Sequence, residues 1–540
     1  MPTETEQHEQ DDTTGTAPSS EEAAGGFRGK SFARFTVLAA VFVCSACGLV
    51  YELALVALGS YLIGNSVGQA SIVLSLMVFA MGMGALLAKP LQRWAAVSFV
   101  AVELVLALLG GLSVLGLYAA FAWLSLYMPM LIATSLVLGV LIGAEIPLLM
   151  VLLQRIRRQE AGSAVADMFA ADYVGALIGG LAFPFLLLPL LGQIKGALLV
   201  GMLNAAAGLG LVLTVYRREL GKRLVTLMTV LALLVGGVLG GAFALSNHFE
   251  TTARQALYSD PVVFAERTKY QEVVLTRSRS LTGPEDTRLY LNGDLQFSSV
   301  DEHRYHEALV HPAMTGDHSN VLILGGGDGL ALREVLRYPD VEQATLVEMD
   351  PAVLQLGRTD TRLTSLNDHA FDDPRVNTVT TDAFSWLRDN RNRYDVVLVD
   401  MPDPDSTETA KLYSTEFYTL VQQAMAEGAR VNVQAGSPYF AAEAYWCIEA
   451  SMREASLSTV PYSRPIPSFG QWGFHLGEAD GSAPSLRLPD RAPPLRTLDE
   501  ETLRSASVFP PDRDRIPSVE PSTLMHPRII EYERGAWQNY

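Results

Sequence analysis

Long uncharged apolar segments fill the first half of this chain and constrain its fold more than any other feature. Seven such segments occupy residues 36–61, 69–88, 97–123, 129–153, 170–191, 196–216 and 224–246. Each is near the roughly 20 apolar residues that cross a bilayer. A soluble helical bundle rarely has seven successive runs of this length, and after His248 the composition becomes that of an ordinary soluble protein. We therefore expect a multi-pass α-helical membrane domain over 35–247, in contact with the lipid bilayer, and a globular half after it.

The first residues differ from both halves. They are polar and carry seven acids before the first arginine, Arg28. Such a composition cannot bury enough apolar surface to fold, and acids that precede any apolar stretch exclude a cleaved signal peptide. Residues 1–34 are therefore predicted to be a disordered acidic tail.

Ionisable and sulfur side chains also occur inside the apolar half. Acids lie in or at the ends of the predicted spans, at Glu52, Glu103, Glu145, Asp167 and Asp172. Hydrogen bonds between helices or an interfacial position explain them most simply, and a polyamine or proton pathway is the alternative. Cys44 and Cys47, one helical turn apart, indicate helix packing. The cysteine spacing predicts no disulfide framework and no metal site.

A nucleoside-binding pattern marks the globular half. Residues 321–350 read as an apolar strand, a glycine loop with Gly325 and Gly327, a helix, and a second strand that ends in Glu348. The acid at that strand end is placed to bond the hydroxyl groups of a ribose. Asp328 inside the loop would repel a pyrophosphate or a carboxylate and attract a cation. The pattern therefore predicts an adenosine ligand that carries an amine.

The rest of the globular half predicts two kinds of sheet. Asn292 and Gly293 lie between two alternating runs, the strongest short hairpin signal, so residues 248–300 should form a small β subdomain with a β-hairpin. Strand and helix patterns then alternate, which predicts an α/β doubly wound parallel sheet, Rossmann-like and of the methyltransferase type, over 301–482. Residues 483–540 are rich in proline and should form a wrapping or loosely ordered C-terminal extension.

Several ordered motifs carry a family resemblance. They are Gln271-Glu272, DEHRYHEALVHPAM from Asp301, LGGGDG from Leu324, VEMDP from Val347, TDAF from Thr381, VDMPDPDS from Val399 and LYSTEFY from Leu412. Together they resemble the spermidine synthase (polyamine aminopropyltransferase) family over about 265–475, and the fused apolar half looks like its membrane-attached bacterial branch. The resemblance implies transfer of an aminopropyl group from decarboxylated S-adenosylmethionine to putrescine or a related amine, giving spermidine and methylthioadenosine. It implies this cosubstrate in place of a permanently bound cofactor, and it leaves homo-oligomer formation open.

The resemblance also implies roles for individual residues. Asp400 resembles the catalytic acid that holds and deprotonates the attacking amine. Asp328 and Asp403 would hold ammonium groups, and Tyr305 and His306 would close over the aminopropyl and polyamine chains. The thioadenosine would be bound by Gln271, Glu348, Asp382, Ala383 and the loop glycines Gly325 and Gly327.

Some of these assignments have alternatives. Asp382 could be a helix N-cap, because aspartate is favoured there, and His306 could be a structural histidine. Asp405, Ser406 and Thr407 replace a Gly-Pro segment that is usual in the family, and Pro467 and Phe469 lie where an amine-contacting tyrosine is expected. The acceptor is therefore open: putrescine, a longer diamine or another amine.

Two other functions share parts of the pattern. An S-adenosylmethionine-dependent methyltransferase has the same fold, but its cosubstrate carries a carboxylate that Asp328 would repel. A polyamine-binding membrane transporter or sensor has no use for the proton acceptor Asp400. The net charge of −18 and the lack of a basic stripe disfavour nucleic-acid binding.

Charge in the connections bears on which side of the cell membrane the globular half occupies. Basic residues mark every second connection: Lys89 and Arg93, then Arg155, Arg157 and Arg158, then Arg217, Arg218, Lys222 and Arg223. By the positive-inside rule these connections are cytoplasmic, and seven spans then place the globular half outside. A nucleoside cosubstrate, however, is expected in the cytosol, and one of the spans, the long 36–61 run or the fifth segment with Asp167 and Asp172, could be re-entrant or fail to cross. We give the chemistry more weight and predict a cytoplasmic catalytic domain.

Overall fold

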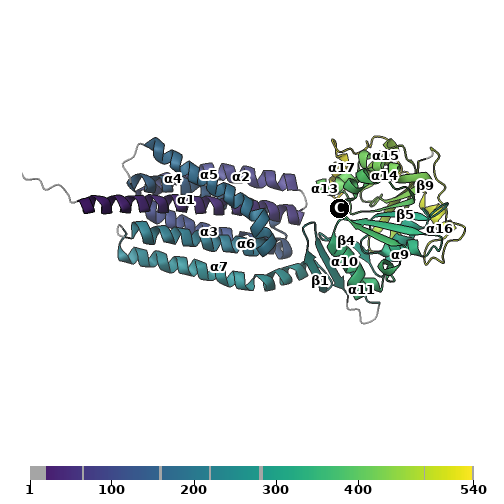
Figure 1. Ribbon diagram of the computed structural model, residues 1–540, viewed down its shortest axis with the longest axis horizontal. Coiled ribbons are helices and arrows are strands. Elements are labelled where there is room, and N and C mark those ends of the chain that lie inside the picture. Colours follow the sequence, from purple (N-terminus) through teal and green to yellow (C-terminus); the bar gives the residue numbers. More distant parts are fainter. Residues whose placement is uncertain are drawn as a thin grey trace, which may run out of the picture. The chain divides into compact units, whose positions relative to one another are not determined.

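The protein consists of two compact units, Met1–Leu257 and Tyr258–Tyr540. The structure, a computed structural model, describes residues 20–63, 66–156, 161–217, 220–278, 284–479 and 481–537. Figure 1 shows that the first unit is helical and that the second combines strands and helices.

Seven α-helices make up the described part of the first unit. They are α1 (Ser20–Ile63), α2 (Ser66–Leu87), α3 (Ala95–Ala119), α4 (Tyr127–Ile156), α5 (Ala161–Ala182), α6 (Leu188–Leu211) and α7 (Lys222–Leu257). Short 3-10 or π segments, η1 (Lys89–Trp94), η2 (Ala120–Leu124), η3 (Phe183–Leu187) and η4 (Val212–Tyr216), lie beside them.

Two predicted boundaries of this unit are wrong. Helix α1 begins at Ser20, so residues 20–34 are helical and do not belong to a disordered tail, while residues 1–19 lie outside the described range. Helix α7 continues to Leu257, past the boundary predicted at 248. There the Thr251 hydroxyl donates to the Asn247 carbonyl, and Arg254 pairs with Glu250 one turn away. Charged residues end the apolar run, but they extend the helix through contacts at i, i+4.

Within the described residues, six helical segments are long and apolar enough to cross a membrane, and the fifth, Val165–Tyr216, has 52 residues. A straight helix of that length would measure about 78 Å, more than twice a bilayer core of about 30 Å. Gly192, with φ 72°, interrupts the helix, and this left-handed conformation is one that glycine adopts without strain. The long segment therefore contains two helices, at the positions of the apolar segments 170–191 and 196–216.

Close glycine contacts show the relative directions of several helices. In α5, a Cβ on Gly175 or Gly179 would collide with the carbonyl oxygen of Phe42 or Ala46 in α1, so α5 runs parallel to α1. Against α3, Gly201 of α6 lies at Ala107 and Gly208 at Glu103, so α6 runs antiparallel to α3. Because α3 also runs parallel to α1, with Gly110 against Tyr51 of α1 and Glu103 beside Cys44, the chain reverses between α5 and α6.

Helices α2 and α4 pack through the same kind of contact. A Cβ on Gly139 or Gly143 of α4 would collide with the carbonyl oxygen of Met77 or Met81 in α2. Gly84 of α2 in turn lies against the Val140 backbone. Small residues allow helix backbones to approach closely, which is typical of helices that associate in membranes.

The second unit begins with a four-stranded antiparallel sheet. Its strands are β1 (Val262–Arg267), β2 (Glu272–Arg277), β3 (Thr287–Leu291) and β4 (Asp294–Ser298), in that spatial order. Asn292 and Gly293 connect β3 to β4 with φ values of 53° and 98°. Positive φ at both positions is what a two-residue hairpin turn requires, so the predicted hairpin is confirmed.

A seven-stranded sheet forms the centre of the second unit, in the order β10-β11-β9-β8-β5-β6-β7. Its strands are β5 (Asn320–Gly325), β6 (Gln343–Glu348), β7 (Val376–Thr380), β8 (Tyr394–Asp400), β9 (Met425–Gln434), β10 (Ser458–Ile466) and β11 (Gly470–Glu478). Strands β5 to β9 are parallel, but β10 and β11 pair antiparallel. The predicted purely parallel sheet is therefore wrong at this edge, because a short hairpin connects β10 to β11 without a crossover helix.

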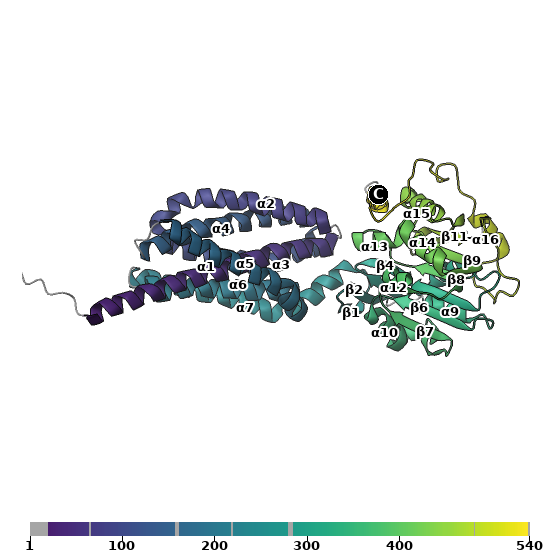
Figure 2. The ribbon, with the colours of Figure 1, turned by 45° about the horizontal axis from the view of Figure 1, so that its top comes forward.

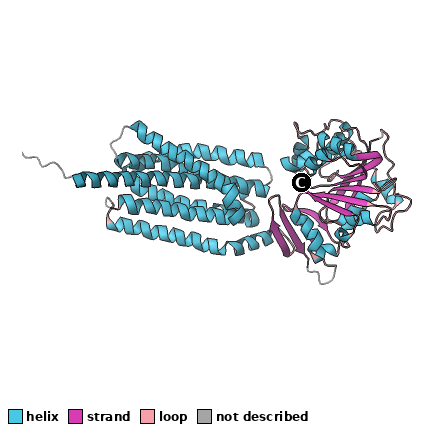
Figure 3. Cartoon of the chain, viewed as in Figure 1, coloured by secondary structure: helices cyan, strands magenta, loops and turns pink. Residues whose placement is uncertain are grey.

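Helices cover both faces of this sheet (Figures 2 and 3). On one face, Leu322 and Leu324 of β5 pack with α12 (Ala383–Asp389), α14 (Thr415–Ala424), α15 (Ala442–Glu454) and α17 (Arg528–Trp537). On the other, Val321 and Ile323 pack with α8 (Glu302–Val310), α9 (Leu330–Leu336) and α16 (Glu500–Ala506). Alternate β5 side chains thus enter two cores, as a doubly wound sheet requires.

The C-terminal extension wraps around this unit. Glu307 of α8 accepts hydrogen bonds from the backbone N–H groups of Arg496 (2.6 Å) and Thr497 (2.9 Å). The Ser522 N–H donates to the Ser451 hydroxyl in α15 at 2.9 Å. Of the two arrangements left open for 483–540, the described residues show the wrapping one.

Candidate active site

The carboxyl ends of β5 and β8 bring the predicted site together. Gly325 is the register partner of Asp400, and the spatial order of the sheet reverses between these two strands. Ligands of open α/β sheets bind in the crevice at such a switch point. The loop after β5 and the acids after β8 therefore lie where a ligand is expected.

The glycine loop is bent tightly against β8. Gly325 and Gly329 have φ values of 86° and 82°, and the Gly326 N–H donates to the Asp400 carbonyl at 3.1 Å. A Cβ on Gly327 would lie 2.9 Å from the Glu348 carboxylate. Only glycine fits these positions without strain, so the loop holds the ends of β5, β6 and β8 close together.

The loop acid Asp328 is turned toward its own helix. Its Oδ1 accepts the Leu330 N–H at 2.8 Å, and its side chain is buried. Burial raises the pKa of Asp328 to about 6, with the nearby His306 opposing this shift and the Asp400 charge adding to it.

Glu348, Gln271 and Asp350 form a second group at the end of β6. Burial raises the pKa of Glu348 to about 7, although its Oε1 accepts the Asp350 N–H at 2.8 Å. Gln271 precedes β2, and its Nε2 donates to Asp350 Oδ2 at 3.2 Å. The buried Asp350 also caps α10 (Pro351–Thr359), where Oδ1 accepts the Ala352 N–H at 3.0 Å. Glu348 therefore keeps one oxygen directed to the loop that Gly327 belongs to.

Tyr305 and Asp400 are directly bonded. The Tyr305 hydroxyl on α8 donates to Asp400 Oδ1 at 2.6 Å. Burial raises the pKa of Asp400, while the charge of His306 and the Tyr305 hydrogen bond oppose the shift. The Tyr305 ring packs against Phe474 and Phe469, with centroids 5.4 and 6.2 Å away. This packing fixes the hydroxyl and with it one oxygen of the carboxylate.

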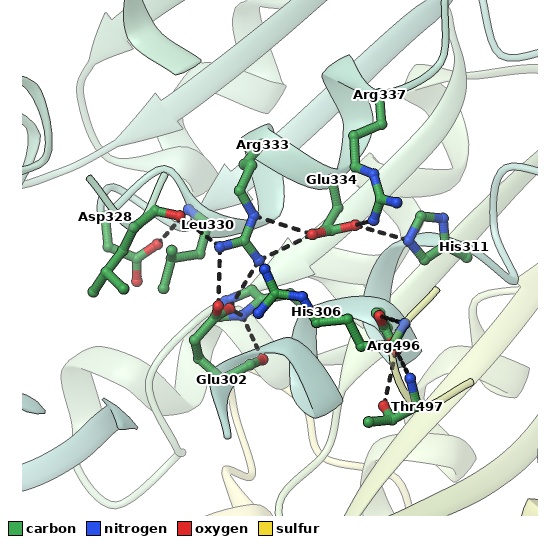
Figure 4. Close-up of polar contacts among 12 residues, drawn as sticks. Glu302, His306, His311, Asp328, Leu330, Arg333, Glu334, Arg337, Arg496 and Thr497 are labelled. Atoms are coloured by element: carbon green, nitrogen blue, oxygen red, sulfur yellow. Dashed lines mark hydrogen bonds and ion pairs between the residues drawn. The ribbon is translucent and has the colours of Figure 1, made fainter. Parts of the chain in front are cut away.

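A buried network supports His306 (Figure 4). His306 Nδ1 lies 2.9 Å from Glu302 Oε2, and Arg333 donates to both Glu302 oxygens at 2.9 Å. Burial acts to raise the pKa of Glu302, but the bonds from His306 and Arg333 outweigh it and lower the pKa to about 2. Burial opposes charge on His306, yet Glu302, Asp328 and Asp400 together raise its pKa. Glu302 and the two aspartates therefore favour the protonated form of the His306 imidazole.

Asp403 lies past the end of β8 and is held by an amide. Gln434 Nε2, from β9, donates to Asp403 Oδ1 at 3.2 Å and to the Tyr413 hydroxyl at 2.7 Å. Burial and the charge of Glu533 from α17 raise the pKa of Asp403 to about 8, and Asp294 and Asp405 add to the shift. Acids from the hairpin, the β8 loop and the C-terminal helix therefore act on this end of the site.

Asp382 and Ala383 lie at the turn after β7. Asp382 is the N-cap of α12, where Oδ1 accepts the Ser385 N–H at 2.8 Å, and Oδ2 pairs with Lys411 at 2.6 Å. The helix-cap alternative for Asp382 is thus what the structure shows, while Ala383 is buried at the start of the helix. Both oxygens of this carboxylate already have protein partners.

The departures from the usual motif have local explanations. Ser406 and Thr409 form a reciprocal capping box at the start of α13 (Thr407–Ala410), which stabilises the turn without a Gly-Pro segment. Phe469 packs on Trp472 with ring centroids 4.9 Å apart, and Trp472 donates to Gln434. The aromatic position therefore contributes apolar surface and no hydroxyl.

Sequence reasoning missed several polar residues of this region. Glu302 and Arg333 form the network behind His306, Gln434 holds Asp403, and Glu533 comes from the far end of the chain. The motif that begins at Asp301 predicted helix α8. It did not predict that Glu302 pairs with Arg333, because Arg333 lies in a different helix. No sequence signal pointed to Gln434 or Glu533, since their contacts depend on strand order and on how the extension wraps.

Comparison with known proteins places this geometry in a family. The family model for the "Spermine/spermidine synthase domain" matches residues 302–485. The chain is 57% identical to polyamine aminopropyltransferase 1 of Streptomyces coelicolor over 98% of this chain and 99% of that protein. It is 46% identical to the polyamine aminopropyltransferase of Mycobacterium tuberculosis H37Rv over 93% of this chain and 97% of that protein.

A solved spermidine synthase in complex with the transition-state analogue AdoDATO is 25% identical, with a TM-score of 0.43 over 46% of this chain and 85% of that one. The two bacterial relatives match both units of this chain along nearly their whole length. The chain belongs to the polyamine aminopropyltransferase family.

Proposed function

We propose that the chain transfers an aminopropyl group from decarboxylated S-adenosylmethionine to putrescine or a related amine, giving spermidine and methylthioadenosine. The observation that carries this proposal is the hydrogen bond of 2.6 Å between Tyr305 and Asp400 at the carboxyl edge of the sheet. It orients a half-buried carboxylate through one oxygen and leaves the second oxygen for a ligand. A carboxylate positioned at such an edge is suited to hold an amine and to accept its proton as a general base.

The charges of the site support a cationic ligand. Asp328, Asp400 and Asp403 are three carboxylates whose pKa values burial raises. An ammonium or sulfonium group beside them would favour their ionised forms and lower these pKa values. The site is thus complementary to a substrate pair that brings several positive charges.

Each residue has a part in the proposed reaction. Asp403 and Asp328 bind ammonium groups, and Tyr305 and His306 close over the aliphatic chains. Asp400 holds the attacking amine, whose lone pair forms a bond to the carbon next to sulfur while the carbon–sulfur bond breaks. The electron pair stays on sulfur and gives methylthioadenosine, and the proton released from nitrogen passes to Asp400.

The thioadenosine part would lie over the loop glycines. We propose that Glu348 bonds the ribose hydroxyls, because its carboxylate lies at the end of β6 against Gly327. Gln271, Asp382 and Ala383 would complete this side. Since Lys411 and Ser385 occupy the Asp382 oxygens, we propose that Asp382 acts by holding the α12 turn beside the base.

The experiment that tests the function is a product assay on the full chain. Decarboxylated and intact S-adenosylmethionine are each incubated with a panel of diamines, and the products are identified by mass. We expect methylthioadenosine and an amine heavier by one aminopropyl group, formed only from the decarboxylated cosubstrate. Methyl transfer from intact S-adenosylmethionine would contradict the proposal and favour a methyltransferase.

The raised pKa values predict a pH dependence. A carboxyl with a raised pKa is neutral below that pKa and ionised above it, and only the ionised form attracts an ammonium group. With Asp403 at about 8 and Asp328 at about 6, kcat/KM for the amine should rise as the pH increases from 6 to 8. The Asp403→Asn variant should lose the part of the rise nearest pH 8. Superimposable profiles of the two proteins would exclude this role, since the titration of the amine itself is common to both.

We further propose that the helical unit lies in the cell membrane and that the catalytic unit works in the cytoplasm. Six apolar helical segments are long enough to span a bilayer. Decarboxylated S-adenosylmethionine is a charged nucleoside that does not cross a bilayer unaided, so the site should face its source. With seven alternating helices, the N-terminus and the basic connections then lie outside, against the positive-inside rule.

Reporter fusions test this topology. A fluorescent protein after Tyr540 should be bright, and alkaline phosphatase there should be inactive. Fusions at Gly221, between α6 and α7, serve as the matched control, because the two ends of α7 must give opposite results. Active phosphatase after Tyr540 would place the enzyme outside and require an exported cosubstrate.

A further inference from the structure

Four polar side chains from four helices meet inside the helical unit. They are Cys44 of α1, Glu103 of α3, Glu145 of α4 and Asn204 of α6, and their exposed fractions are 1%, 0%, 4% and 0%. One ligand atom from each of Cys44, Glu103 and Glu145 lies within 4.8 Å of the other two. Asn204 lies beside Glu103. We call these four residues the buried polar cluster.

Most polar atoms of the cluster lack a hydrogen-bond partner. This applies to both carboxylate oxygens of Glu103, one oxygen of Glu145, and the amide oxygen and nitrogen of Asn204. The hydroxyl of the fully buried Tyr51 also lacks a hydrogen-bond partner. It lies close enough to the buried polar cluster to interact with it electrostatically. Buried polar groups in native proteins are nearly always bonded, so a set of this size indicates a missing partner.

No side-chain cation compensates the cluster among the described residues. The charges that act on Glu145 come from Glu103 and Asp172, both acids. Elsewhere in the unit, Asp167 does pair with a base, because Arg34 donates directly to it, although the sequence suggested no base for it. Two carboxylates held together in a dry interior require either added protons or a bound cation.

The donor set decides between these possibilities. A proton shared by the two carboxyl groups would satisfy one oxygen of each, and it would leave the other buried Glu103 oxygen and both polar atoms of the Asn204 amide without partners. An alkylammonium ion would use the carboxylates and the amide but has no need of a thiol. A thiolate with two carboxylates and an amide oxygen is a set that borderline-soft divalent ions accept.

We propose that Cys44, Glu103 and Glu145 bind a divalent metal ion of the zinc class, with the Asn204 carbonyl oxygen as the fourth ligand. Donor atoms around a tetrahedral zinc ion are about 3.5 Å apart, so atoms already within 4.8 Å of one another need only small side-chain shifts. The ion would join α1, α3, α4 and α6. Sequence spacing gave no hint of it, because each ligand comes from a different helix.

Metal analysis of the purified full chain tests the site. After any polyhistidine tag is removed and the protein is equilibrated with zinc and then desalted, we expect about one zinc ion per chain. The Cys44→Ser variant should lose most of it. Cys47→Ser is the matched control: this thiol lies one turn further along α1, outside the three-residue ligand set, and contacts the Val200 carbonyl.

Cobalt substitution gives a second measurement. Co²⁺ bound in the cluster should show a thiolate charge-transfer band that is present in wild type and Cys47→Ser and absent in Cys44→Ser. Zinc should also raise the thermal midpoint of wild type and not of Cys44→Ser. Wild-type protein free of zinc after this treatment, or equal zinc in wild type and Cys44→Ser, would overturn the proposal. None of these measurements depends on aminopropyl transfer, so a negative result here would not contradict the proposed reaction, and a failure of the proposed reaction would not contradict the metal site.

Discussion

Replacing Asp400 with asparagine should lower turnover by about a hundredfold or more and leave thioadenosine binding nearly intact. The amide keeps the shape of the side chain but cannot take the proton that the attacking amine releases, and a positioned general base contributes about 10²- to 10⁴-fold. The Tyr305 hydroxyl would still find an oxygen, that of the new amide, at the position where it now bonds Asp400 Oδ1. Because this base acts mainly in the transition state, kcat should fall and the binding constant of methylthioadenosine should not.

Steady-state kinetics and calorimetric binding of methylthioadenosine measure the two quantities. Asp395→Asn is the matched control, because Asp395 lies at the other end of the same strand and its carboxylate accepts the Asn320 N–H at 2.9 Å. Its turnover should stay near that of wild type. Equal kcat values for the Asp400 variant and wild type would remove Asp400 from the proposed proton transfer.

The Glu302→Gln variant should lose both stability and activity. Glu302 holds two donors of Arg333 and the ring of His306 in a buried site. Loss of one partner from a buried ion pair costs about 3–5 kcal/mol, and here Glu334 still pairs with Arg333, so the lower value applies. For a unit of this size, about 3 kcal/mol corresponds to a fall of roughly 6–12 °C in the thermal midpoint.

The activity loss has a separate cause and a separate signature. Without the carboxylate, the pKa of His306 should fall, so the imidazole beside Asp328 and Asp400 should lose its proton at a lower pH than in wild type. The kcat/KM profile should then shift along the pH axis, which simple loosening would not produce. Glu307→Gln on the same helix is the control, since Glu307 holds the backbone of Arg496 and Thr497. It should lower stability without moving the pH profile.

Local patterns in the sequence predicted much of the fold. The hairpin at Asn292-Gly293 follows from residues that accept positive φ, and the β5 loop follows from the glycines that its bend requires. The start of α1 and the end of α7 could not be predicted in this way, because both helices extend beyond their apolar runs. The antiparallel strands β10 and β11 were also missed, since strand direction depends on a short turn that resembles many others.

The site was predictable where one segment carries the chemistry. Asp400 and Asp403 follow a buried strand, and Glu348 ends another, so strand geometry alone gathers them at one edge. Contacts that join distant segments were not predictable: Gln434 reaches Asp403 only because β9 lies next to β8, and Glu533 acts there only because α17 packs against α15. Asp382 is the opposite case: its role as a helix N-cap depends only on neighbouring residues, so the sequence could predict it, and the structure shows it.

The glycine contacts between α4 and α2, and between α5 and α1, bear on how this chain tolerates mutation. Where backbone meets backbone, even one added methyl group must push two helices apart, whereas a large apolar side chain on the outer surface can be exchanged for another. A saturation scan of the helical unit should therefore find its least permissive positions at the smallest residues, Gly139, Gly143, Gly175 and Gly179. Divergent descendants of this sequence should keep these positions small while the outward-facing leucines and valines drift.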